Sequence, residues 1–322
     1  MDNKITKKRL SNFFAYEWIK IAVVVLLAVL FFELIFTMTA PHLSFGQQFK
    51  LIYDEGVSGR LDNNLIEVII SEGDKNGFSY EIQKIEAEVM QSGENNALSL
   101  RYKTYDADIV ITEKNKRSDN TLRVNSIIDN LNVWSFEKAI LDAEAYLNKF
   151  VKDQLKDQDG ASLVYENLDQ AKIENAFTAK MAKDKRFRKK DVFQAGLKAE
   201  KERLKMICSD VADIKYLLET HPELFYKYTK YTQATEIAKN TDNYQSTLER
   251  LQAQKEMSYG ILPEKLMGGK HKASEYFKSN ETTENVVVVS FDFIGPFEEY
   301  QFENLRFFVS VIDNFSNFLQ GR

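Results

Sequence analysis

The first feature of the hydrophobic pattern is an almost uninterrupted apolar run over residues 21–40, IAVVVLLAVLFFELIFTMTA. Helical residues rise by about 1.5 Å each, so a run of this length spans the roughly 30 Å of a bilayer core. The pattern therefore predicts one N-terminal transmembrane helix over residues 21–40, preceded by a short tail over residues 1–20.

Strand and helix patterns alternate between residues 45 and 115. Residues 47–53 and 78–89 have the pattern of strands, and ADIVIT at 107–112 predicts a short buried strand. Ser58 suits the cap of a helix whose apolar face extends to Ile69, and a second helix is predicted over 95–105. This order predicts a parallel sheet with right-handed crossovers and a ligand crevice at the carboxyl ends of its strands.

The next part of the chain has mainly helical spacing. Ser135 is expected to begin a helix, and the clearest helical pattern extends from Asp191 to Thr220. No segment between residues 162 and 256 has a convincing strand pattern. Tyr226, Tyr228 and Tyr231 are interpreted as one face of a helix.

Strand character returns near the end of the chain, at SYGILP (258–263) and at NVVVVSFDF (285–293). Four consecutive valines in the latter predict a strand buried on both faces, and a final helix follows it. The predicted fold class is α/β, a domain of two lobes. Residues 45–115, completed by 284–322, form the α/β lobe, and residues 116–283 form a helix-rich lobe.

Charges around the apolar run predict its orientation. Five basic residues and two acidic ones precede the run, and the first basic residue after it is Lys50. The positive-inside rule then places the N-terminus in the cytoplasm and the C-terminal domain outside it, in a single-pass protein of the cell membrane. A cleaved signal peptide is the alternative, which Met38 before Ala40 does not favour. The formal net charge of −5 argues against a nucleic-acid partner.

Candidate chemistry is sparse in this sequence. Cys208 is the only cysteine, and its place on the apolar side of a helical pattern predicts a small core residue. Histidine occurs only at positions 42, 221 and 271, and the common zinc, phosphate-loop, dinucleotide and nucleophile-elbow motifs do not occur. We therefore predict no enzyme activity, no catalytic residue, no metal and no cofactor.

Six residues near predicted strand ends or the crossing between the lobes are candidates for ligand binding. Carboxylates there can bind polar groups, and aromatic rings offer flat apolar platforms for sugars or peptides. A carboxylate-based glycosidase, with Asp54 and Glu113 as its pair, is a weaker hypothesis. Solvated loop charges and core aromatics are the simpler interpretation of each residue. The candidates are Tyr53, Asp54, Glu55, Glu113, Trp134 and Tyr259.

A basic run, KMAKDKRFRKK, covers residues 180–190. Such a run is either a surface for an anionic polymer or lipid headgroups, or a solvated helix end.

The element order, together with DADIVIT at 106–112 and YGILP at 259–263, resembles the extracellular solute-binding proteins of ABC transporters, which have the type II periplasmic-binding fold. It is similar in particular to membrane-anchored bacterial proteins built on that plan. The resemblance covers residues 47–319 in layout and implies two lobes that close on a ligand by hinge motion and pass it to a permease. Tyr105, Asp106 and Asp108 match the pattern as a turn and a strand start.

These observations lead to two hypotheses from different classes. The first is a membrane-anchored, non-enzymatic protein that captures a small polar solute, such as a sugar or peptide, or acts as an accessory to an ABC transporter. The second is a structural or interaction protein of the cell envelope, in which residues 162–256 bind another envelope protein and the cleft is vestigial.

Overall fold

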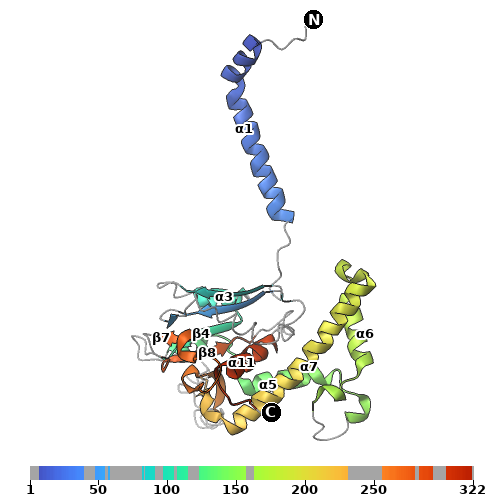
Figure 1. The fold of residues 1–322 in the computed structure, drawn as a ribbon, viewed down its shortest axis with the longest axis vertical. Coiled ribbons are helices and arrows are strands. Elements are labelled where there is room, and N and C mark those ends of the chain that lie inside the picture. The colour runs from blue at the N-terminus through green and yellow to red at the C-terminus, as the bar shows by residue number, and fades with distance from the viewer. Residues whose placement is uncertain are drawn as a thin grey trace, which may run out of the picture. The chain divides into compact units, whose positions relative to one another are not determined.

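The structure is a computed structural model, and it describes residues 7–39, 48–54, 57–58, 82, 84–90, 97–104, 107–114, 123–156, 163–230, 256–279, 283–292 and 302–320. The chain divides into two compact units, residues 1–44 and residues 45–322, and each is described by itself. Figure 1 shows the helices and strands of both units.

The first unit contains one long helix, α1 (Lys7–Thr39). Its stretch from Trp18 to Phe36 has a mean hydropathy of 2.8, and none of that stretch is buried. This stretch rises by about 28 Å, so α1 is long and apolar enough to cross a bilayer core. The predicted apolar helix is therefore confirmed, although the helix begins well before the apolar run.

The second unit is built on a six-stranded mixed sheet with the order β3-β1-β4-β8-β6-β5. The strands β3, β1 and β4 are parallel to one another, as the alternation of strand and helix patterns predicts. The strand β8 is antiparallel to both of its neighbours, β4 and β6, and β5 is antiparallel to β6. The bounds are β1 (Gln48–Tyr53), β3 (Lys84–Val89), β4 (Ile109–Glu113), β5 (Phe225–Tyr228), β6 (Met257–Ile261) and β8 (Val286–Ser290).

The valine run forms a strand near the middle of the sheet, and all five residues of β8 are buried. Successive side chains of a strand point to opposite faces. Val286 and Val288 accordingly pack in one apolar cluster, whereas Val287 and Val289 pack in another. The prediction of a strand buried on both faces is confirmed.

Helices cover both faces of the sheet and give the domain three layers. One face packs against α5 (Phe136–Asn148), α7 (Lys190–Thr220) and α11 (Phe302–Phe315). The other packs against α3 (Ala97–Lys103) and α4 (Arg123–Asn130). Ser135 caps α5 as predicted, because its side chain accepts a hydrogen bond from the backbone N–H of Lys138.

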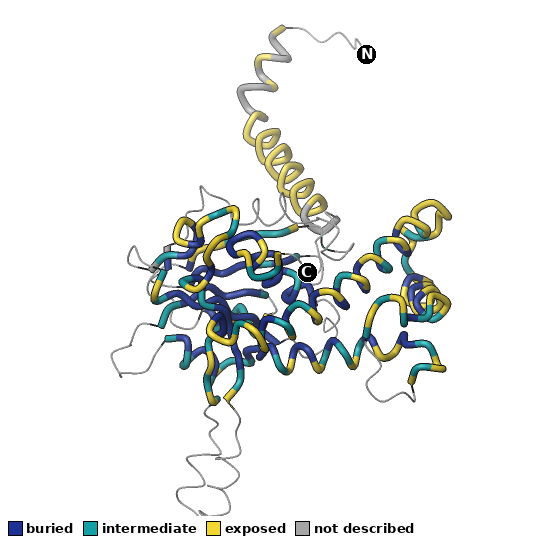
Figure 2. The backbone as a smooth tube through the Cα atoms, turned by 60° about the horizontal axis from the view of Figure 1, so that its bottom comes forward, coloured by how far each residue is buried: buried dark blue, intermediate teal, exposed yellow. Residues whose placement is uncertain are grey.

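A helical arm extends away from the sheet over residues 170–200 (Figures 1 and 2). It consists of α6 (Gln170–Met181), the 3-10 helix η5 (Lys185–Arg188) and the N-terminal part of α7. A Cβ atom at Gly196 would lie 2.5 Å from Cε1 of Phe187 and 2.9 Å from Cζ of Phe177. Glycine at this position of α7 therefore lets two aromatic rings pack directly on the helix.

Short elements complete the second unit. The strand β2 (Val57–Ser58) pairs antiparallel with β7 (Lys278–Ser279). The remaining short helices are η3 (Asp153–Leu155), η4 (Tyr165–Asn167), η6 (Pro222–Leu224), η7 (Pro263–Lys265) and α10 (Ala273–Tyr276).

Two predictions for the middle of the chain are wrong. A strand, β5, does occur between residues 162 and 256, and Tyr226 and Tyr228 lie in it and not on a helix. Their spacing of two puts both hydroxyls on one face, where they bond to Asn125 and Asp129 of α4. Ser58 lies in β2, whereas residues 59–69 of the predicted helix and Tyr231 fall outside the described residues.

The domain is α/β as predicted, but its division into two lobes is not confirmed. The strands β5 and β6 come from the segment expected to form the second lobe, yet they are hydrogen-bonded into the same sheet as β4 and β8. The two-lobed arrangement stays a prediction.

Candidate functional site

The carboxyl ends of β1 and β4 bring together three polar side chains. Asp54 directly follows β1 and is fully buried. Its carboxylate accepts two hydrogen bonds of 2.7 Å from the Nε and NH2 groups of Arg123, at the start of α4. It accepts a third, of 2.8 Å, from the hydroxyl of Thr112 on β4. This is the strand-end position that the sequence predicts for a ligand group.

The hydrogen bonds of Asp54 indicate what this carboxylate does. A two-pronged guanidinium contact is among the strongest pairings of charged side chains, and here it fixes the start of α4 against the end of β1. A carboxylate near a helix N-terminus is also stabilised by the helix dipole. Asp54 therefore holds α4 against the carboxyl ends of β1 and β4, and ligand binding by it stays a prediction.

Glu113 and Glu55 are the other predicted carboxylates. Ile109 and Ile111 of β4 pack in the cluster beneath α5, α7 and α11, so alternation places Glu113 on that face as well. Asp54 contacts α4 on the opposite face. A glycosidase needs both carboxyl groups beside the same glycosidic bond. Asp54 and Glu113 lie on opposite faces of the sheet and do not meet this requirement. Glu55 lies outside the described residues.

The three predicted aromatic platforms are buried and do not converge. Tyr53 and Trp134 pack in the same cluster, but Tyr53 pairs with Ile111 in the middle of β4. The backbone N–H of Trp134 instead bonds to Ser290, the partner of Ile109 at the start of β4. The indole N–H of Trp134 donates to Asp142 at 2.9 Å. Tyr259 packs in the cluster on the other face. Burial raises the pKa of Tyr53 well above its ordinary value.

A buried charge cluster lies between α7 and α11, and sequence reasoning missed it. Arg203, only 2% exposed, donates to Glu303 at 3.0 Å and to Glu200 at 3.3 Å. One turn farther along α11, Arg306 donates to Asp210 at 3.0 Å. Burial raises the pKa of Asp210 to about 7 and that of Glu303 to about 7, although the arginines oppose this rise. The signal in the sequence was charged positions bordering the apolar stripe of α7.

Cys208 lies on the same helix and matches its prediction. It is buried in the apolar cluster, and burial raises the pKa of its thiol to about 12. A thiol with this pKa is a poor nucleophile at neutral pH, because the thiolate is the reactive form.

A groove between α7 and α11 borders the charge cluster and has a volume of about 440 Å³. Asn314, which is 1% exposed, donates to the carbonyl of Ser310, and its Oδ1 has no hydrogen-bond partner among the described residues. A buried acceptor without a partner is costly unless something else supplies a donor. The polar residues of the lining are Ser209, Asp213, Arg306, Ser310, Asp313 and Asn314.

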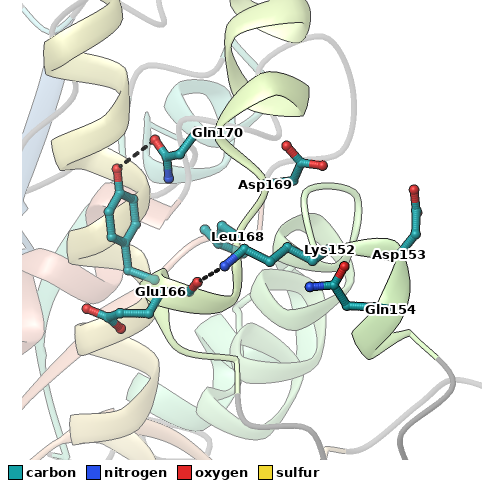
Figure 3. A pocket seen from close by; sticks show the side chains of 8 residues that line it. Lys152, Asp153, Gln154, Glu166, Leu168, Asp169 and Gln170 are labelled. Atoms are coloured by element: carbon teal, nitrogen blue, oxygen red, sulfur yellow. Dashed lines mark hydrogen bonds between the residues drawn. The ribbon is translucent and has the colours of Figure 1, made fainter.

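A second hollow, of about 610 Å³, lies where η3 and η4 meet the start of α6 (Figure 3). Its polar groups are used by the local structure. Lys152 donates to the carbonyl of Glu166, and the hydroxyl of Tyr165 donates to Gln170. Asp169 caps α6 by accepting from two backbone N–H groups. We therefore place the candidate site in the groove between α7 and α11.

Comparisons with protein-family models, with curated proteins and with solved structures gave no match. The likeness to solute-binding proteins accordingly stays a prediction from element order and two short motifs. Tyr105 and Asp106 lie outside the described residues, whereas the carboxylate of Asp108 accepts from the backbone N–H of Lys50 at 2.7 Å. This contact ties the start of β4 to β1 and is structural.

Proposed function

We propose that this chain is a membrane-anchored binding protein, which holds residues 45–322 outside the cytoplasm and captures a small polar solute there. The helix α1 supports the anchor, because its apolar stretch has the length of a bilayer core. The excess of basic residues before that stretch supports a cytoplasmic N-terminus.

The groove between α7 and α11 is the observation that carries the binding function. Its volume of about 440 Å³ lies within the range of small-molecule sites. Its lining combines the guanidinium of Arg306 with the carboxylates of Asp213 and Asp313, so it suits a solute bearing both donors and acceptors. Asn314 also lines the groove, and a solute can donate to its buried Oδ1 only when this side chain turns toward the groove.

The proposal includes delivery of the solute to an ABC permease, and closing of two lobes upon it. The element order of the chain supports both, through its likeness to solute-binding proteins. Because β5 and β6 belong to the main sheet, such closing is limited to the helices of residues 116–283. A permease gene and an ATPase gene beside this one would support delivery.

Thermal unfolding of the full chain in detergent, with amino acids, sugars, short peptides and polyamines added in turn, tests solute capture. A ligand at a hundred times its Kd stabilises the folded state by about 2.7 kcal/mol, which raises the melting temperature measurably. Ala212→Leu fills the groove and should abolish this rise. Ala195→Leu, an exposed alanine on the arm of the same helix, should retain it. Stabilisation by none of these classes would count against capture.

The alternative, an interaction protein of the envelope, is favoured by one specific observation. The predicted aromatic platforms Tyr53, Trp134 and Tyr259 lie in the core, while the helical arm projects from the domain (Figure 2). Co-purification of one stable partner, unaffected by Ala212→Leu but lost with substitutions on the arm, would favour this function over solute capture.

A further inference from the structure

The end of the helical arm is strongly basic. Residues 180–191, named here the basic tip, carry seven basic and two acidic side chains in a chain whose net charge is −5. All seven basic side chains are exposed, and Arg186 pairs with Asp184. The other acidic residue, Asp191, lies in the first turn of α7. The tip therefore keeps a positive excess on an otherwise acidic molecule.

The basic tip is held by aromatic rings that extend the main apolar cluster into the arm. The rings of Phe177 and Phe187 meet edge to face at 5.7 Å, and Phe177 meets Phe193 at 5.2 Å. Gly196 leaves the space that the first two rings need. Asp184 caps η5 through the backbone N–H of Arg186, which fixes the turn between α6 and α7. The charges are thus presented by a folded element and not by a frayed helix end.

We propose that the basic tip docks on the anionic lipid headgroups of the membrane that holds α1. This rests on the proposed anchor, because the anchor is what keeps the domain beside a bilayer. Residues 40–47 separate α1 from β1, and eight residues cannot span more than about 28 Å. The part of α7 within the arm, residues 190–200, is about 16 Å long and carries the basic tip away from the sheet. Lysine and arginine near an anionic bilayer surface are attracted to it within about 10 Å.

Energy transfer in lipid nanodiscs tests this docking on the full chain. A donor dye is placed at Ala182→Cys in the basic tip, and acceptors are placed on headgroups of neutral discs or of discs containing phosphatidylglycerol. The native Cys208 is buried, and its labelling is measured on the parent chain. We expect higher transfer in the anionic discs, and a fall to the neutral-disc value in 0.5 M salt.

Two charge reversals on the same helix give the matched comparison. The pair Lys189→Glu and Lys190→Glu, in the basic tip, should remove most of the extra transfer. The pair Lys198→Glu and Lys205→Glu, exposed farther along α7, carries the same charge change and should leave most of it. Equal transfer in neutral and anionic discs, or equal effects of the two pairs, overturns the proposal.

Further outcomes distinguish lipid docking from binding of a soluble polyanion, and failure of docking from failure of the anchor. Tight binding of soluble polyphosphate by the wild-type tip, with no response to phosphatidylglycerol, overturns lipid docking in favour of a polyanion. Incorporation into the discs is scored separately by co-elution with lipid. If the protein does not incorporate into the discs, both the membrane anchor and the docking of the basic tip are contradicted. Solute capture is tested separately, by thermal unfolding.

Discussion

Asp54 and Arg123 show at the residue scale how one side chain depends on another that is distant in the sequence. The carboxylate of Asp54 is fully buried, and the side chain of Arg123 is 14% exposed. Removing one member of a buried pair leaves a charge without compensation, which costs about 3–5 kcal/mol. We therefore expect Arg123→Ala to lower the free energy of unfolding by about 3 kcal/mol in urea titrations.

Arg186→Ala is the matched control, because this arginine pairs with Asp184 at the surface and should cost less than about 1 kcal/mol. Adding Asp54→Asn to Arg123→Ala should recover part of the stability, since the buried charge is then gone. A loss below about 1 kcal/mol for Arg123→Ala would show that water replaces the guanidinium.

The buried charge cluster predicts an unusual dependence of stability on pH. Its two arginines, Arg203 and Arg306, face three carboxyl groups, so a fully ionised cluster has one negative charge in excess. Burial raises the pKa of Asp210 and that of Glu303 to about 7, so below pH 7 the folded state holds protons that the unfolded state releases near pH 4. These groups therefore stabilise the fold at low pH, and that stabilisation is lost as pH rises toward 7.

Urea unfolding between pH 5 and pH 8 measures this contribution. Each retained proton gives a fall of about 1.4 kcal/mol per pH unit up to about pH 7, and the profile is flat above it. Asp210→Asn should remove much of the slope, whereas Asp313→Asn, on the exposed side of α11, should preserve it. Identical slopes for wild type and Asp210→Asn would show that Asp210 is ionised throughout.

At the scale of elements, a β-bulge in β6 changes the face of the sheet on which the residues of this strand pack. Consecutive residues Tyr226 and Lys227 of β5 pair with Gly260 and Ser258, so Tyr259 is an extra residue, a β-bulge. The bulge lets Tyr259 pack on one face of the sheet, while Ile261, two residues later, packs on the other. Simple alternation along the sequence predicts the same face for both residues.

Gly260, beside this bulge, is expected to tolerate no side chain. A Cβ atom there would lie 2.5 Å from the backbone oxygen of Val288, on the neighbouring strand. Gly260→Ala must push β6 and β8 apart, and overpacking of this kind costs about 1–3 kcal/mol or more. Thermal unfolding should show a melting temperature several degrees lower. Ser258→Ala, at another buried position of the same strand, should cost less because it adds no atom.

At the scale of the whole molecule, α1 determines where the domain is held. An arginine in the middle of a transmembrane helix costs about 2.5–3.5 kcal/mol on insertion scales. Leu27→Arg combined with Leu30→Arg should therefore shift the protein from the membrane pellet to the soluble fraction after carbonate extraction. The same pair of changes at Leu100 and Leu141, which are exposed on the domain, should leave it in the pellet.

Protease protection checks the orientation separately. Protease added outside intact cells should digest the domain if the N-terminus is cytoplasmic. Protection of the domain until the cells are opened would reverse the assignment.

Most of the regular elements could be predicted because their signals are local. The apolar run of α1, the valine run of β8, the Ser135 cap of α5 and the long amphipathic pattern of α7 each depend on neighbours within a few residues. The strand β5 was missed because four residues are too few to show a period. Its tyrosines are explained by bonds to α4, about a hundred positions earlier in the chain.

The candidate site could be predicted far less well. The predictions for Asp54 and Glu113 gave the right strand ends, but not the faces on which their side chains lie. Trp134 lies just before α5 and Tyr259 in the middle of β6, and both are buried in the core. The groove at Asn314 combines residues about a hundred positions apart on α7 and α11, so no local pattern marks it.

The sequence by itself determined the apolar N-terminal helix, the parallel pairing of the first strands and the fully buried valine strand. These follow from hydrophobic transfer and backbone periodicity, which act over short stretches of chain. The tertiary structure alone decided that Asp54 pairs with Arg123, that β5 and β6 join the main sheet, and that two arginines and three carboxyl groups are buried together. Those outcomes depend on which segments, far apart in the sequence, bury their surfaces against each other. This is settled only when the helical layers pack on the sheet.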